Sequence, residues 1–246
     1  MDVQGLMTDV VFGLCKPIFA YENKKRVLVG SCSFLKVGDE GFLITARHVL
    51  ETRGDGPLFV GTRKGPLSLV RGYYKSHLSP VADDKFDIAV YPLIEDDLER
   101  LEDDALFIVK DMIIDTTLSQ HPACVLGYPS SKNKGLFAKD EPILVQTHGI
   151  QTNVVEASAV LLQRHGANAE ANFFLNFSRP DGEPQLFSPK GMSGGLVIGG
   201  HSASSSKVLG MPIELSKDGK LILCTHYKVI YNTVERLQSK VGRVDK

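Results

Sequence analysis

The stretch SPKGMSGGLVIGG, residues 188–200, places an internal serine, Ser193, among glycines and runs directly into an apolar segment. Glycines at 191, 194 and 195 permit a sharp turn and let a carbonyl group approach the amides of Gly191 and Ser193, as an oxyanion hole requires. A serine hydroxyl is a weak nucleophile and needs a base that a third group orients. Glycine-rich turns with a serine are common, so this stretch alone favours a turn that leads into a strand.

Short apolar segments rich in β-branched residues recur along the chain, and turn-forming residues separate them. The segments 10–21, 26–37 and 41–46, for example, are divided by ENKK and GDEG. About a dozen such segments with few long helical patterns favour an all-β fold of antiparallel sandwiches or barrels. Apolar residues at helical spacing within 227–240 predict a closing amphipathic helix, and the acidic segment 95–111 is the best candidate for a connection between two lobes.

Composition excludes several classes of protein. The chain carries 28 Lys and Arg against 29 Asp and Glu, so no positive field is present to hold a phosphate backbone, and no nucleic-acid partner is expected. No apolar run reaches membrane-spanning length, and the N-terminus lacks the charge pattern of a secretory signal. The cysteines are widely spaced in apolar contexts, which predicts buried free thiols, a cytoplasmic location and no zinc site. They are Cys15, Cys32, Cys124 and Cys224.

Two upstream segments supply the partners that Ser193 would need. TARHVL, residues 45–50, ends an apolar strand and places His48 at the start of a short helical turn. DIAVYPL, residues 87–93, places Asp87 at the entrance to the next strand, where burial would fix the carboxylate against an imidazole. Asp83 and Asp84 lie close enough in sequence to compete for this role.

Taken in order, these three segments resemble the His, Asp and Ser motifs of chymotrypsin/trypsin-like serine peptidases. TARHVL is similar to their TAAHC segment, DIAVYPL to their DIAL strand and GMSGG to their GDSGG turn. VLGYPSS, residues 125–131, resembles an element of the HtrA-like branch, and VLGMPIE, residues 208–214, resembles the strand that pairs with the substrate backbone. The similarity spans most of residues 10–240, strongly at the three motifs and loosely between them.

The resemblance implies a fold and a reaction. The expected fold is two antiparallel six-stranded β-barrels with a C-terminal helix, in one peptidase domain over residues 1–246. Its first lobe spans about 10–110 and its second about 111–225, and no room remains for a PDZ domain. By resemblance Ser193 is the nucleophile, His48 the general base, Asp87 the group that orients it, and the amides of Gly191 and Ser193 form the oxyanion hole. This chemistry needs no cofactor and no metal.

Several positions depart from the digestive members of this family. Met192 stands where those members have the aspartate of their zymogen switch, so that switch is not expected. Val49 stands where Cys32 would have its disulfide partner, which agrees with a reducing compartment. The resemblance places Phe187, Ile213 and Glu214 around the primary substrate pocket. Phe187 favours a small or apolar substrate side chain, whereas Glu214 favours a basic one, and the choice stays open.

The sequence leaves alternatives beside a selective endopeptidase acting on a protein or peptide substrate. A regulatory or operon-encoded protein is a further candidate partner. The same fold could serve as a latent or inactive protein-binding module, although such a scaffold has no need of His48, Asp87 and Ser193. A Ser-Lys dyad with Lys190 is less favoured because a lysine in a turn is usually solvated. An esterase of the α/β-hydrolase class is least favoured because its motifs run Ser, Asp, His.

Overall fold

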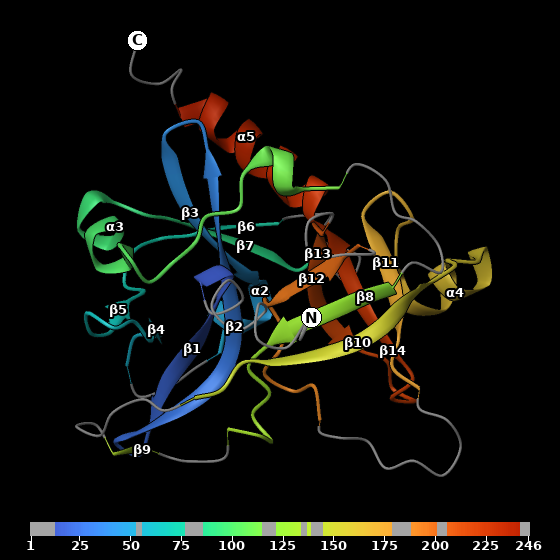
Figure 1. Cartoon of the computed structure of the whole chain (residues 1–246), viewed down its shortest axis with the longest axis horizontal. Helices are drawn as coiled ribbons and strands as arrows, with labels where there is room; N and C mark the ends of the chain where they lie inside the picture. The colour runs from blue at the N-terminus through green and yellow to red at the C-terminus, as the bar shows by residue number, and fades with distance from the viewer. Residues whose placement is uncertain are drawn as a thin grey trace, which may run out of the picture.

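The structure is a computed structural model in which the chain folds into two β-rich halves (Figure 1). It describes residues 13–52, 56–76, 86–114, 122–133, 137–138, 145–178, 188–200 and 206–241. We call the half that contains β1 to β7 the N-terminal half and the half that contains β8 and β10 to β14 the C-terminal half. The predicted all-β fold with a closing helix is confirmed.

The N-terminal half is an antiparallel sheet built from hairpins. Its path runs β5-β4-β1-β2-β3-β7-β6, and β9 pairs with β2 beside this path. The first hairpin turns at Asn23 and Lys24, which have φ of 49° and 63° and separate the paired residues Glu22 and Lys25. Two successive residues with positive φ match the right-handed twist of the flanking strands. The strands are β1 Cys15–Glu22, β2 Lys25–Val37, β3 Glu40–Ala46, β4 Phe59–Val60, β5 Leu67–Ser68, β6 Tyr74–Lys75, β7 Ile88–Pro92 and β9 Phe137–Ala138.

This half differs in detail from the expected six-stranded barrel. Its described strands form one eight-stranded sheet, and no pairing among the described residues joins the end strands β5 and β6 into a closed ring. β4, β5 and β6 are only two residues long. The segment around them contains Pro57 and Pro66, which lack the N–H that a continuous ladder needs. Short strands in this segment leave a half-barrel rather than a full one.

The C-terminal half is the closed six-stranded barrel that was expected. Its strands pair in the order β10-β11-β14-β13-β12-β8, and every described pairing is antiparallel. Its core contains Val125, Phe173, Val197 and Cys224, together with the side chain of Met192. The strands are β8 Pro122–Gly127, β10 His148–Val155, β11 Asn172–Asn176, β12 Leu196–Gly199, β13 Lys207–Leu215 and β14 Leu221–His226.

The closing helix joins the two halves. α5, Tyr227–Val241, buries Tyr227, Ile230 and Val234 on one face, as the apolar spacing predicted. It leaves the C-terminal barrel and lies against the N-terminal half (Figure 1), where Tyr227 Oη and Ser33 Oγ are 3.0 Å apart and Gln238 Nε2 donates to Val37 O. The other helices are short: α2 Arg47–Leu50, α3 Glu95–Leu101, α4 Ala159–His165 and the 3-10 turn η1 Lys110–Met112.

The cysteines are free, as predicted, and three of the four are buried. Burial raises the pKa of Cys15 to about 12 and that of Cys124 to about 11, so both thiols stay protonated and unreactive near neutral pH. None of the described helices combines the length and the apolar character that crossing a bilayer would take. The predicted lobe boundaries and the cytoplasmic location stay predictions.

Candidate active site

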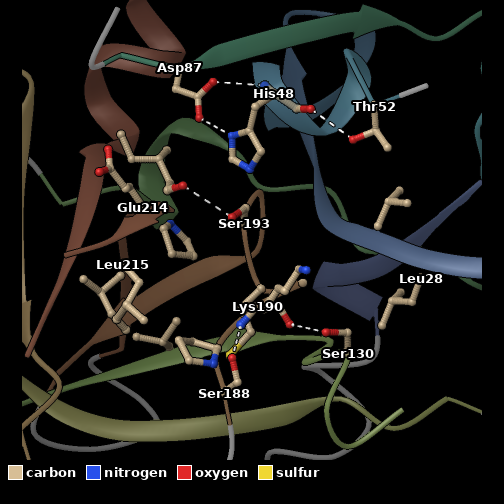
Figure 2. Close-up of a pocket in the computed structure, with 18 of the residues that line it drawn as sticks. Leu28, His48, Thr52, Asp87, Ser130, Ser188, Lys190, Ser193, Glu214 and Leu215 are labelled. Atoms are coloured by element: carbon tan, nitrogen blue, oxygen red, sulfur yellow. Dashed lines mark hydrogen bonds and ion pairs between the residues drawn. The ribbon is translucent and has the colours of Figure 1, made fainter. Parts of the chain in front are cut away.

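A cavity of about 790 Å³ is lined by most of the residues that the sequence singled out (Figure 2). Both halves line it: β1, β2 and α2 from the N-terminal half, and residues 188–193 and β13 from the C-terminal half. His48, Asp87 and Ser193, which are far apart in sequence, all border this cavity. Site chemistry at this position therefore depends on the two halves together.

Asp87 and His48 form a close pair. His48 Nδ1 lies 2.5 Å from Asp87 Oδ2. Since a carboxylate only accepts hydrogen bonds, Nδ1 carries the proton in this contact, and a neutral imidazole then has its lone pair on Nε2. The His48 side chain is half exposed, whereas that of Asp87 is 13% exposed. Asp87 is thus shielded behind the ring, and Figure 2 shows the ring of His48 between Asp87 and Ser193.

The short helix α2 and Asp87 hold one another in place. The first amides of a helix have no partner within it. Here Arg47 N donates to Asp87 O at 2.8 Å and His48 N donates to Asp87 Oδ1 at 3.0 Å. Asp87 has φ of 44°, a left-handed conformation that aspartate tolerates better than most residues. One carboxylate therefore fixes both the backbone and the ring of His48.

Ser193 sits in a tight turn, residues 188–195, which we call the nucleophile turn. Gly191 and Gly194 have φ of 95° and 84°, so the turn needs glycine at both positions. Ser193 Oγ donates to Ile213 O at 3.3 Å. Among the described residues, no hydrogen bond joins Ser193 Oγ to His48 or to the side chain of Lys190. The serine therefore shares the cavity with His48 but is bonded to the backbone of β13.

The amides of Gly191 and Ser193 are available to a ligand. Neighbouring amides in the turn are used, with Met192 N bonded to Pro189 O and Gly194 N to Pro212 O. Within the described part of the chain, neither Gly191 N nor Ser193 N donates to a protein group. Two unused amides beside a serine can together hydrogen-bond a negatively charged oxygen.

The structure describes only some of the other residues that were predicted for the site. Ile213 and Glu214 line the cavity from β13, whereas Phe187 lies outside the described residues, as do Asp83 and Asp84. Met192 is 1% exposed and packs in the barrel core. In the described part of the chain, no group of three His, Cys, Asp or Glu side chains is arranged to hold a metal.

Two serines at the nucleophile turn, Ser31 and Ser130, were not predicted from the sequence. Ser31 is fully buried on β2 and bonds to the turn from 160 residues away in sequence. Ser130 follows β8 and bonds to Lys190 O. The one available signal was the polar Ser31 within the largely apolar segment 27–35, which also contains Ser33. A polar residue there suggests a buried hydrogen bond but does not identify its partner.

Comparison with known proteins identifies the fold. No protein-family model matches the sequence, and no curated protein matches it. Many solved structures resemble it, and three of them serve as examples. The protease Anisep from Arthrobacter nicotinovorans is 12% identical with a TM-score of 0.57, and the match covers 92% of this chain and 97% of that one. The MamO protease domain from Magnetospirillum magneticum is 13% identical with a TM-score of 0.52 and the same two coverages.

The third is a chain from a structure on the coupled folding and binding of the Sesbania mosaic virus VPg protein. It is 13% identical with a TM-score of 0.52, and the match covers 89% of each chain. At these identities the likeness concerns the fold alone. The chain therefore has the chymotrypsin-like two-barrel fold of protease domains, with one barrel closed and the other a half-barrel. Membership of the HtrA-like branch stays a prediction.

Proposed function

We propose that the protein is a serine endopeptidase that cleaves protein or peptide substrates through His48, Asp87 and Ser193. The observation that carries the proposal is the 2.5 Å contact of His48 Nδ1 with Asp87 Oδ2, in a cavity that Ser193 and its unused amide also line. A largely shielded carboxylate that fixes the tautomer of an exposed imidazole suits general-base catalysis. The structural neighbours named as proteases share the fold and support this class of reaction.

In the proposed reaction, Ser193 Oγ attacks the substrate carbonyl carbon while His48 Nε2 takes the hydroxyl proton. The amides of Gly191 and Ser193 hydrogen-bond the resulting oxyanion, and Asp87 stabilises the imidazolium. Collapse of the intermediate breaks the C–N bond, and His48 returns its proton to the leaving amine. Water, deprotonated by His48, then hydrolyses the acyl-enzyme and regenerates Ser193.

One movement must precede attack, because Ser193 Oγ is bonded to Ile213 O. Rotation about the Cα–Cβ bond of Ser193 between staggered positions would redirect Oγ. The bond given up is long, at 3.3 Å, and a neutral hydrogen bond contributes about 1 kcal/mol net. This cost is small beside a catalytic barrier. In the proposal, a substrate whose own amide binds Ile213 O would compete for that acceptor and release Ser193.

The same bond favours the second candidate function, a latent or inactive protein-binding module with the protease fold. In that case Ser193 would stay on Ile213 O. We also propose, as predicted from the sequence, that the endopeptidase is cytoplasmic and selective for a few protein partners.

A cleavage assay on a peptide library tests the proposal. Purified protein is incubated with peptides of diverse sequence, and mass spectrometry identifies the new termini. We expect cleavage by the wild type, none by Ser193→Ala, and a rate lower by about 10⁴-fold for Asp87→Asn, since the amide would hold the wrong tautomer. Equal cleavage by Ser193→Ala would rule out the assigned nucleophile. A folded wild type that cleaves nothing would favour the binding module.

A further inference from the structure

Ser31 connects the N-terminal half to the nucleophile turn through two hydrogen bonds. Its amide donates to Ser193 O at 2.9 Å and its Oγ donates to Gly191 O at 2.9 Å. The same Oγ accepts from Tyr128 N at 3.0 Å, and Ser31 O accepts from Thr45 Oγ1 at 2.7 Å. Both the amide and the hydroxyl of this fully buried serine are thus committed to the other half of the molecule.

The carbonyl before Gly191 is held as well. Lys190 O accepts from Ser130 N at 2.8 Å and from Ser130 Oγ at 3.0 Å. Each of the two peptide groups that flank Gly191 is therefore held at its carbonyl oxygen. Ser130 holds Lys190 O, and Ser31 holds Gly191 O. A Cβ on Gly191 would lie 2.7 Å from Tyr128 O, so little space is left for this backbone to shift toward β8.

Each held carbonyl fixes the N–H of its own peptide group: Lys190 O fixes that of Gly191, and Gly191 O fixes that of Met192, which donates to Pro189 O. The described peptide bonds are all trans, and a planar trans peptide directs its C=O and N–H in opposite directions. With Lys190 O held at Ser130, the N–H of Gly191 must point away from Ser130. Gly191 would otherwise be free to rotate, since glycine populates positive and negative φ about equally. The hydrogen bonds of Ser31 and Ser130 remove that freedom.

We propose that Ser31 is a positioning residue whose hydroxyl keeps the oxyanion hole formed before substrate binds. This inference rests on the proposed function, because it assigns the amides of Gly191 and Ser193 to an oxyanion. Met192, which stands where the resembled peptidases have an aspartate, is buried in the barrel core, and the hydrogen bonds from Ser31 and Ser130 hold the turn. Catalytic geometry then depends on contact between the two halves.

The test compares Ser31→Ala with Ser33→Ala. Both serines lie on β2 and are fully buried, and each hydroxyl bonds to the C-terminal part of the chain. The Ser33 hydroxyl, however, contacts Tyr227 Oη and not the nucleophile turn. Ser31→Ala keeps the amide that bonds to Ser193 O and removes only the hydroxyl. The matched pair therefore separates loss of a buried hydroxyl from loss of support at the turn.

Two measurements are made on each folded variant. Hydrogen–deuterium exchange of the peptide 188–195 reports on the turn without requiring activity, and the rate of fluorophosphonate labelling reports on the assembled site. We expect Ser31→Ala to exchange faster in this peptide and to label at least about tenfold more slowly, approaching the 10²–10³ that loss of an oxyanion-hole donor costs. Ser33→Ala should match the wild type in both.

Three outcomes would each overturn the inference. The peptide 188–195 of Ser31→Ala could exchange as slowly as in the wild type, this variant could label as fast as the wild type, or Ser33→Ala could show the same losses as Ser31→Ala. If the wild type is folded but never labels, the proposed function fails, and exchange alone then decides whether Ser31 holds the turn. If Ser31→Ala does not fold, Ser31→Cys replaces it with the same expected outcomes. Cysteine is close to serine in shape, but its thiol is a weak hydrogen-bond donor.

Discussion

At the nucleophile turn, glycine is required by space as well as by backbone conformation. Gly194 has φ of 84°, and a Cβ placed on it would collide with Ser31 O and Thr45 Oγ1. Gly219, in the turn between β13 and β14, has a similar φ of 68°, but a Cβ placed there would meet nothing within 4 Å. The two glycines therefore differ in crowding and share a left-handed backbone.

This difference gives a prediction for two alanine variants. Gly219→Ala should lower the free energy of unfolding by about 1 kcal/mol, the cost of a left-handed non-glycine residue. Gly194→Ala should add about 1–3 kcal/mol of overpacking and abolish labelling of Ser193, because backbone and Thr45 must move. Denaturant titration of both variants measures the difference. Equal stability of the two would contradict the close packing described for the turn.

Local sequence motifs were enough to predict the main candidate site residues, but not the hydrogen bonds between residues that are far apart in the sequence. The order of His48, Asp87 and Ser193 is a local pattern that can be read from one chain, and the structure brings all three to one cavity. Their catalytic roles stay predictions. Ser31 escaped notice because its partners, Gly191 and Tyr128, lie about a hundred residues or more away in sequence, and a serine in a strand does not reveal its partner.

Among the structural elements, β14 carries a partly buried titratable group, His226, at its end. Burial lowers the pKa of His226 from 6.5 to about 4, and a hydrogen bond with the backbone of Asn172 partly opposes the shift. The ring also packs 4.8 Å from that of Phe173, measured between centroids. His226 is therefore neutral in the folded protein at neutral and mildly acidic pH.

This shift predicts that acid destabilises the protein. The unfolded chain protonates His226 near pH 6.5, whereas the folded chain does so only near pH 4, so stability is full above 6.5 and falls as the pH drops toward 4. Between pH 7 and 5 the loss from this group should be about 2 kcal/mol. His226→Phe should remove that part of the pH dependence in urea titrations. An unchanged pH dependence in this variant would exclude His226 as its source.

Elements set by local chemistry were predictable, and closure of the sheets was not. The strands, the turn at Asn23 and Lys24, and the helix α5 follow from apolar spacing and turn residues within a few positions. Whether a sheet closes depends on pairing between its two end strands. In the N-terminal half those end strands are β5 and β6, each two residues long. The apolar pattern alone did not predict that strands in this proline-containing segment would be so short.

For the whole molecule, the cavity depends on how the two halves are joined. Besides Ser31, a second hydrogen bond crosses between them close to the site. Thr225 on β14 is fully buried, and its Oγ1 donates to Phe86 O at 2.8 Å. Phe86 is the residue immediately before Asp87. The C-terminal barrel thus supports the backbone that presents the carboxylate to His48.

Thr225→Val should weaken both stability and chemistry. Removing the donor to Phe86 O should cost about 1–3 kcal/mol, and labelling of Ser193 should slow because Asp87 loses support. The control is Thr233→Val in α5. Thr233 Oγ1 also donates over 2.8 Å to a backbone carbonyl, Val229 O, but within one helix. The control should stay within about 0.5 kcal/mol and label normally. If both substitutions lowered stability and labelling equally, the hydrogen bond from Thr225 would have no specific role in supporting Asp87.

The most direct test of the proposed active site is fluorophosphonate labelling of the purified protein, with the modified peptide located by mass spectrometry and Ser193→Ala as the control. We expect the wild type to carry the label on Ser193 and the variant to carry none. A folded wild type without label, or a label on any other residue, would contradict the assignment of Ser193 as a nucleophile activated by His48 and Asp87.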